Sequence, residues 1–448
     1  MPLELVHDRS SRVSAKVLGA AALESRAGDW DRLAANALEE NPLYSRAFVT
    51  AGLDELGERN GFLALGVVRA DEAGIERLIG LLPLRRTRFR YGLPTCVDLG
   101  ARNLFQPNGT PLIDRDHAAE AIDGLLGALG GPGGLAPNLL LGGIRRDGAF
   151  ARVLLDRGGS AGLEATVVET FSRPVLRPVE ADAESYLTRH VAPKRLRELR
   201  RTHRRLTEQG SLAYRHVETP AEIRAAVEDF LRIELSGWKG QARTALLSRP
   251  ETAAFGRAAF SGLNAGSPIA SADVLALDGS AIAVSLNLQI GRTCFALKCA
   301  YDESLRRFSP GLVLEYLVIE HLFSSRFADE MDSCVTQGGH VIQDLWDGAE
   351  EIGTLALARR GSRIGLGPIG LGLAEAETRR ARLRSHAKER YIAAREMVGD
   401  ARAMLTGEDR SAAKAMRARL DASSKRAMMT FTGAQPNGEF AAVLTTMI

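Results

Sequence analysis

The 448-residue sequence has little cysteine and no long apolar run. Its four cysteines show no metal-ligand spacing, so no metal site is predicted, and we expect them to be reduced, buried thiols. No run approaches the roughly 18 apolar residues of a membrane-spanning helix, and residues 1–16 lack the apolar segment of a signal peptide. We therefore expect a cytoplasmic protein without a transmembrane segment. The cysteines are Cys96, Cys294, Cys299 and Cys334.

The charge of the whole chain is almost balanced, at +3, and favours no particular class of partner. Its distribution is more informative, because residues 375–426 hold fourteen Lys or Arg against eight Asp or Glu. With 45% hydrophobic and 25% charged residues the composition is typical of a globular protein, and the length predicts two to three domains. From Pro-rich and Gly-rich boundaries we predict domains at 1–172 and 173–361, followed by a Gly-rich linker and a basic helical tail at 362–448.

The stretch 293–323 changes its hydrophobic period in the middle. Residues 293–301 alternate and predict a strand, whereas the stretch from Gly311 onward predicts a buried helix that is interrupted by Glu315 and Glu320. Between them lies a short polar turn, in which Pro310 suits the first turn of a helix and Ser309 can cap it.

A strand, a turn of small residues and the start of a buried helix can bind an anion. The free N–H groups at the helix start point outward, and the helix dipole adds partial positive charge. Arg306 and Arg307 supply full charges beside the turn. The local pattern is equally consistent with a capped helix next to two solvated arginines.

The turn resembles the Arg/Gln-x-x-Gly-x-Gly/Ala motif with which GNAT-superfamily acetyltransferases hold the pyrophosphate of acetyl-CoA. Ser309 stands where that motif has its first glycine. The sequences Lys-x-x-Tyr-Asp at 298–302, Arg-Phe-Ser-Pro-Gly at 307–311 and Ser-Gly-Trp-Lys-Gly at 236–240 are similar to the CelD-like, BioF-type acetyltransferase branch. The resemblance covers about residues 25–360 and implies the following acetyl-CoA-binding residues: Arg306, Arg307, Phe308, Ser309, Gly311 and Leu312.

The order of predicted elements from residue 212 onward, β-α-α-β-β-β-α-β-β, is that of a GNAT domain. The first half resembles a degenerate domain of the same kind and has no turn like that at Arg306. We therefore predict an α/β (α+β) mixed sheet built from two tandem GNAT-like domains, similar to the arrangement of the Fem aminoacyltransferases, with a C-terminal basic helical extension.

Acyl transfer to an amine requires a rigidly held donor, a polarised carbonyl and a route for the amine proton. Asp302 follows the strand near the turn, and Glu234 lies one turn before Trp238 on a predicted helix, so either carboxylate is a candidate general base. The alternatives are a turn or cap residue for Asp302 and a solvated helix charge for Glu234.

Lys298 is a further candidate catalytic residue. Its predicted neighbours on the strand face, Ala296 and Ala300, are small and leave room for a ligand. Tyr301 next to Asp302 completes the candidate catalytic set, and Trp238 and Lys239 are the candidate substrate-binding residues. One position departs from the family pattern, because Gln343 stands where relatives often carry a lysine.

A basic helix is predicted at 193–209, with seven Lys or Arg between Lys194 and Arg205. It could bind phosphate or nucleic acid, or it could be a solvated outer helix whose arginine stems cover apolar surface. Because no aromatic residue is interleaved for base stacking, we favour the solvated helix or substrate steering.

The sequence thus predicts an acyltransferase that uses acetyl-CoA, or another acyl-CoA, as its co-substrate. The acceptor would be an amine or hydroxyl on a small molecule or sugar, by resemblance in exopolysaccharide or cellulose biosynthesis. The alternatives are a Fem-like transferase that uses aminoacyl-tRNA, and a non-catalytic scaffold of a polysaccharide-biosynthesis complex. Nucleic acid is otherwise not an expected partner, and no oligomeric state is predicted.

Overall fold

The computed structural model describes residues 12–90, 93–100, 105–131, 134–261, 268–336 and 341–359. Contacts divide the chain into two compact units, and apart from residues 242–244 the described residues belong to the first, Met1–Gln241 with Ala245–Leu371. The tail predicted to be helical at 374–428 lies outside the described residues.

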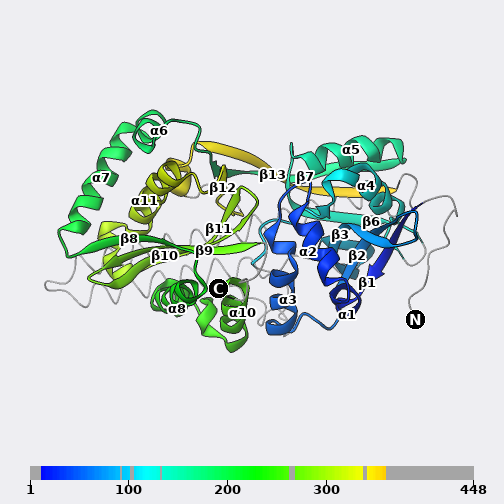
Figure 1. The fold of residues 1–448 in the computed structure, drawn as a ribbon, viewed down its shortest axis with the longest axis horizontal. Coiled ribbons are helices and arrows are strands. Elements are labelled where there is room, and N and C mark those ends of the chain that lie inside the picture. Colours follow the sequence, from blue (N-terminus) through cyan, green and yellow to red (C-terminus); the bar gives the residue numbers. More distant parts are fainter. Residues whose placement is uncertain are drawn as a thin grey trace. The chain divides into compact units, whose positions relative to one another are not determined.

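The described strands form one mixed sheet of thirteen strands, which confirms the predicted α/β class (Figure 1). Their order is β1-β2-β3-β4-β6-β13-β7-β12-β11-β10-β9-β8, with β5 beside β3. The strands are β1 Val13–Leu18, β2 Leu63–Ala70, β3 Glu76–Arg90, β4 Leu93–Gly100, β5 Leu112–Ile113, β6 Asn138–Arg145, β7 Leu163–Leu176, β8 Leu212–Val217, β9 Ile269–Leu277, β10 Ser280–Ile290, β11 Thr293–Tyr301, β12 Glu330–Asp332 and β13 Gly348–Arg359.

Helices cover both faces of each half of this sheet (Figure 1). In the first half, α4 and α5 share a core with one face, and α1, α2 and α3 share a core with the other. In the second half, α6, α7 and α11 pack on one face and α8 and α10 on the other. The helices are α1 Ala20–Glu24, α2 Ala27–Ala35, α3 Arg46–Glu55, α4 Ala118–Gly127, α5 Ala149–Ser160, α6 Ala183–His190, α7 Pro193–Thr207, α8 Pro220–Ser236, α9 Trp238–Gln241, α10 Pro250–Ser261 and α11 Pro310–Ser325.

The two halves repeat one topology. Each has a strand, a group of helices, three strands in an antiparallel meander, and then a helix that leads to a parallel strand. In the first half the parallel pair is β4 with β6, joined through α4, and in the second half it is β11 with β12, joined through α11. The repeat agrees with the predicted tandem arrangement.

The two halves exchange their last strands. The strand that follows the first half, β7, pairs antiparallel with β12 of the second half. The strand that follows the second half, β13, pairs antiparallel with β6 of the first half, and β7 and β13 also pair with each other. Since β7 runs across residues 172 and 173, neither sheet half is built from one continuous stretch of sequence, and the predicted domain limits remain predictions.

A network of buried charges holds this exchange in place. Arg173 on β7 is almost fully buried, donates to the Val335 and Pro107 carbonyl oxygens at 2.9 Å, and lies 3.4 Å from Asp332. Arg145 on β6 pairs with Asp332 at 3.3 Å and with Glu330. A buried arginine needs such partners, because an unpaired buried charge is strongly destabilising.

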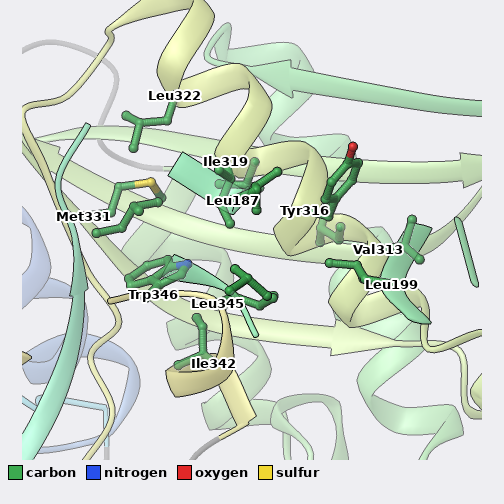
Figure 2. Close-up of a cluster of buried hydrophobic side chains, with 14 of the residues drawn as sticks. Leu187, Leu199, Val313, Tyr316, Ile319, Leu322, Met331, Ile342, Leu345 and Trp346 are labelled. Carbon is green, nitrogen blue, oxygen red and sulfur yellow. The ribbon is translucent and has the colours of Figure 1, made fainter. Parts of the chain in front are cut away.

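The large apolar cluster beside α11 contains much of the core of the second half (Figure 2). Apolar residues of α11 fill the space between the sheet and the helices α6 and α7, as the all-round apolar pattern predicted. The elements within the described residues that were not predicted include β1, α1, β5 and α6.

Candidate functional site

The connection from β11 to α11 contains more regular structure than the short turn that was predicted. The Asp302 carboxylate accepts a hydrogen bond from the Ser304 N–H at 2.9 Å and caps a 3-10 helix, η4 (Glu303–Phe308). The alternative interpretation of Asp302 as a cap residue is therefore confirmed. Ser309 follows in a left-handed conformation, with φ 44° and ψ 56°, and α11 begins at Pro310.

The prediction that the Ser309 side chain caps α11 is wrong. A capping side chain requires an extended backbone, whereas Ser309 is left-handed and makes no side-chain cap hydrogen bond. Its carbonyl oxygen instead accepts from the N–H groups of Leu312 at 3.0 Å and Val313 at 3.1 Å. The left-handed backbone also explains the glycine of the related motif, since glycine adopts this conformation without steric cost.

Two arginines are fixed beside this turn by the ring of Phe308. Phe308 is buried, and the guanidinium carbons of Arg307 and Arg205 lie 4.6 Å and 5.4 Å from its ring centroid. Such cation–π contacts order side chains that would otherwise be mobile in solvent. Arg205 comes from the basic helix α7, about one hundred residues earlier in the chain, and was not predicted to belong to the site. Arg306 is exposed on η4.

Gly311 lies against Tyr301, so the end of β11 and the start of α11 are in contact. A β-carbon built on Gly311 would be 3.3 Å from Tyr301 Cδ1, which is a tight contact. No partner is seen for the Gly311 N–H in the described part of the chain, and it is one of the first N–H groups of α11, which point out of the helix. Leu312 is half-buried next to it.

Strand β11 loses its neighbour on one side halfway along its length. It pairs in parallel with β12 at only three positions, Thr293, Cys294 and Phe295. From there to Tyr301, no strand of the described residues pairs with β11 on that side. We call residues 296–301 the open edge of β11. Side chains from Ala296 to Cys299 are partly or fully exposed, although the strand lies inside the sheet. The turn described above lies at the end of the open edge.

A β-bulge in β11 shows that Ala296, Lys298 and Ala300 do not all lie on one strand face, contrary to the prediction. Leu286 on β10 pairs with Lys298, but the next residue, Asn287, pairs with Ala296, so Leu297 has no cross-strand partner. The bulge interrupts the alternation. Ala296 consequently packs against the core beside α11, whereas Ala300 belongs to the core beside α8.

Lys298 itself is half-buried, and its Nζ lies 4.8 Å from the ring centroid of Phe105. Phe105 comes from the first half of the chain and stacks on Phe255 of α10, with centroids 4.9 Å apart. Both halves therefore contribute to the surroundings of the candidate catalytic lysine.

Glu303 connects the two segments whose sequences resemble the acetyltransferase branch, residues 236–240 and 298–311. Its carboxylate accepts a hydrogen bond from the Trp238 N–H at 2.8 Å. A β-carbon on Gly237 would come within 2.6 Å of the same carboxylate, and one on Gly240 within 1.7 Å of the Leu235 carbonyl oxygen. Gly240 is thus required by a close backbone contact, whereas a side chain at 237 would displace the Glu303 carboxylate, which holds α9 against η4.

The candidate base Glu234 is not a solvated helix charge. Its side chain is 3% exposed, its Oε1 pairs with Lys239 Nζ at 2.7 Å, and its Oε2 accepts from the Leu246 N–H at 2.7 Å. Helix α8 ends at Ser236, so Glu234 and Trp238 do not share one helix, contrary to the prediction. Glu234 and Lys239, both predicted as site residues, are brought together as a pair.

A row of polar side chains crosses the sheet and ends at the open edge. Cross-strand pairing aligns His216 with Asp273, Asp273 with Ser285, and Ser285 with Cys299. Asp273 is fully buried and accepts from Asn287 at 2.7 Å, and its Oδ1 lies 2.8 Å from His216 Nδ1. The contact with Asp273 raises the pKa of His216 despite its burial.

The last member of this row, Cys299, is exposed, which corrects the prediction of a buried thiol. Surrounding protein atoms nevertheless desolvate it enough to raise the pKa of its thiol to about 12. Cys294 and Cys334 are buried as predicted, and the side chain of Cys96 lies outside the described part.

Glu315 is another titratable group that this environment affects strongly. Burial, with a smaller contribution from Asp273, raises the pKa of the Glu315 carboxyl to about 8. Its Oε2 has no hydrogen-bond partner in the described chain, and neither has the nearby indole N–H of Trp346. The sequence showed Glu315 only as an interruption of an apolar helix, and its position against a polar row depends on tertiary contacts.

One comparison with known proteins gives a sequence match over this site. A sequence model described as an acetyltransferase (GNAT) domain matches residues 193–335, which include α7, the meander, the turn and β12. No curated protein matches the chain.

Solved structures give weaker likenesses. FemX is 10% identical, with a TM-score of 0.49 over 74% of this chain and 95% of that one. A C-terminal domain assigned to a lysylphosphatidylglycerol synthetase of Agrobacterium fabrum is 12% identical, with a TM-score of 0.47 over 77% and 95%. A tandem GNAT protein of clavulanic acid biosynthesis is 15% identical, with a TM-score of 0.34 over 78% and 99%. At these values the likenesses carry no argument about the site.

Within the described residues, no helix is long and apolar enough to cross a membrane. No cluster of three or more His, Cys, Asp or Glu that could hold a metal ion is found there.

Proposed function

We propose that this chain is an acyltransferase that moves an acetyl group from acetyl-CoA to an amine or hydroxyl acceptor. The GNAT domain match supports acyl transfer in general. The observation that carries the choice of donor is the turn at the end of the open edge. There, α11 begins with outward N–H groups, and the residue two positions before the helix, Phe308, orders two arginines.

In this proposal the pyrophosphate of the donor lies on the start of α11. Arg306 and Arg307 on η4 supply charge, and the Gly311 N–H donates to a phosphate oxygen. Phe308 orients Arg307 and Arg205, Ser309 turns the backbone, and Leu312 packs beside the ligand. The acyl arm would then follow the open edge of β11, where no strand of the described chain occupies the hydrogen-bonding groups beyond Phe295.

The acceptor would approach from the side of α9 and the bulge. Lys298 is proposed to bind or polarise the reacting group, and Trp238 with Lys239 to contact the acceptor. Among the other proposed catalytic residues, Tyr301 and Asp302 lie nearest the turn. Glu234 is the least suited to act as a base, because both of its oxygens are engaged in the contacts to Lys239 and Leu246.

The sequence resemblance extends the proposal to a CelD-like, BioF-type enzyme of the cytoplasm that acts in polysaccharide biosynthesis. A Fem-like transferase that uses aminoacyl-tRNA is the second candidate. It is favoured by three exposed cations, Lys194, Arg197 and Arg201, which lie on one face of α7 at spacings of three and four residues.

A thermal-shift series separates the two donors. Acetyl-CoA at one hundred times its Kd is expected to stabilise the protein by about 2.7 kcal/mol, and bulk tRNA is expected to have no effect at 150 mM salt. Stabilisation by tRNA alone would favour the second candidate and would contradict the proposed donor.

A further inference from the structure

Helix α9 has only four residues, so its position depends on contacts with other elements more than on its own backbone hydrogen bonds. At its end, Gly240 lies against the Leu235 carbonyl oxygen, and the Lys239 carbonyl oxygen accepts from the Ala245 N–H at 3.1 Å. Lys239 also pairs with the buried Glu234. These contacts come from α8 and from the chain that follows α9, and none of them reaches the turn before α11.

Glu303 is the residue that connects α9 to that turn. Its Oε1 accepts a hydrogen bond from the Trp238 N–H at 2.8 Å, although the two residues are 65 positions apart in the sequence. The backbone at Gly237 passes against the same oxygen, because a β-carbon there would lie 2.6 Å from it. Glu303 is the first residue of η4, and Arg306 follows three residues later, about 6 Å along the axis at about 2 Å per residue. One short element therefore contacts α9 at its start and carries a proposed donor-binding arginine near its end.

The contact requires a hydrogen-bond acceptor of this length more than it requires a negative charge. Within the described residues no ion pair includes Glu303, even though Arg306 and Arg307 belong to the same element. The donor is a backbone N–H, which can be bound by a carboxylate oxygen or by the oxygen of a side-chain amide. Glutamine at this position would therefore keep the hydrogen bond, in a weaker form without charge assistance, whereas alanine would remove it.

We propose that Glu303 is a positioning residue for the acyl transfer, because its bond to the Trp238 N–H fixes Trp238 and Lys239 beside the bound donor. Glu303 itself touches neither the donor nor the acceptor. This inference rests on the proposed function, in which the donor binds at the start of α11 and α9 contacts the acceptor. The hydrogen bond then holds the acceptor side at a fixed distance from the donor, and small displacements of reacting groups strongly reduce the rate of transfer.

The fluorescence of Trp238 reports this positioning. Trp30 and Trp346 are buried, and subtracting the signal of the matching Trp238→Phe protein isolates the half-buried Trp238. Acrylamide quenching is measured with and without saturating acetyl-CoA, in parallel with calorimetric titration of acetyl-CoA. In wild type, bound acetyl-CoA is expected to lower the quenching of Trp238 by about twofold or more. Glu303→Ala should raise the quenching in the free protein and abolish this protection, while acetyl-CoA affinity stays within about threefold of wild type. Glu303→Gln should behave like wild type in each measurement.

Asp229→Ala is the matched control, because it removes a partly exposed carboxylate of α8 that pairs with Arg232 at 2.9 Å, and it should change neither quenching nor affinity. Protection of Trp238 that persists in Glu303→Ala would overturn the inference. Equal loss of protection in Glu303→Ala and Glu303→Gln would also overturn it, since the charge and not the hydrogen bond would then be required. A tenfold loss of acetyl-CoA affinity in Glu303→Ala, about 1.4 kcal/mol, would assign Glu303 to donor binding instead. Wild-type protein that does not bind acetyl-CoA would refute the proposed function, whereas unchanged quenching in free Glu303→Ala would refute the positioning contact alone.

Discussion

Replacing Glu315 with glutamine isolates the energetic consequence of burying this carboxyl. Its ordinary pKa is 4.5, and burial raises it to about 8 in the folded protein. The folded state therefore holds its proton more tightly than the unfolded state does. A group of this kind contributes stability that is fully present below pH 4.5 and is lost as the pH rises through 8. Glutamine resembles the protonated acid in shape and charge but does not titrate.

The size of the effect follows from the two pKa values. At about 1.36 kcal/mol per pKa unit, the rise corresponds to an upper limit of about 5 kcal/mol, which relaxation of the protein around the charged form reduces. We expect the Glu315→Gln variant to match wild type near pH 4 and to become more stable than wild type by about 2–5 kcal/mol at pH 9.

Urea denaturation of both proteins at intervals from pH 4 to pH 9 gives the difference curve directly. Other titratable groups with shifted pKa values, such as His216, are present in both proteins, so their contributions largely cancel. Glu320→Gln, on the same helix, serves as the matched control. A flat curve for Glu315→Gln would show that the carboxyl is solvated or paired in solution. Wild type gaining stability over the variant with rising pH would mean that the pKa is depressed, and either result would refute the account of this residue.

Two other predictions concern the turn and the open edge. Ser309→Ala should change the free energy of unfolding by less than about 0.5 kcal/mol, since the hydroxyl caps nothing, whereas Ser309→Val should cost about 1–2 kcal/mol at the left-handed position. Denaturation that shows a loss of about 1 kcal/mol for alanine would restore the capping role. Lys298→Met should strongly reduce acetyl-CoA consumption while lowering stability by only about 0.5–1 kcal/mol through the lost contact with Phe105. Normal activity with a large loss of stability would contradict its proposed role.

Local pattern was sufficient to predict the strand, the turn and the helix at 293–323, because each is encoded by adjacent residues. Hydrophobic periodicity gave their type, and Pro310 gave the helix start. The left-handed Ser309 was not predicted, since serine rarely adopts that conformation. The bulge at Leu297 was missed for a related reason, because an irregular register leaves the composition of a strand unchanged.

The other features that were not predicted depend on contacts between residues far apart in the sequence. Arg205, Glu303 and Glu315 are ordinary charged residues in helical sequence. Arg205 joins the turn because α7 packs on η4, and Glu303 gains its role from the Trp238 N–H at the start of α9. The exchange of β7 and β13 likewise depends on which edges are free once both halves have folded.

The central claim is that a pyrophosphate binds at the start of α11, and two substitutions at Gly311 test it most directly. Gly311→Ala adds bulk alone, and a β-carbon there must displace the partly exposed Tyr301 ring slightly. Gly311→Asp adds a larger side chain that carries a negative charge. For the free protein that charge is mildly favourable at a helix start, by about 0.3–1 kcal/mol. For a bound pyrophosphate the same charge is repulsive.

Titration calorimetry of wild type and both variants with acetyl-CoA, alongside denaturation of the free proteins, gives the decisive comparison. The account predicts that Gly311→Asp is at least as stable as Gly311→Ala but binds acetyl-CoA at least tenfold more weakly than Gly311→Ala, a loss of about 1.4 kcal/mol or more. Equal acetyl-CoA affinities for the two variants would contradict a pyrophosphate site at this turn.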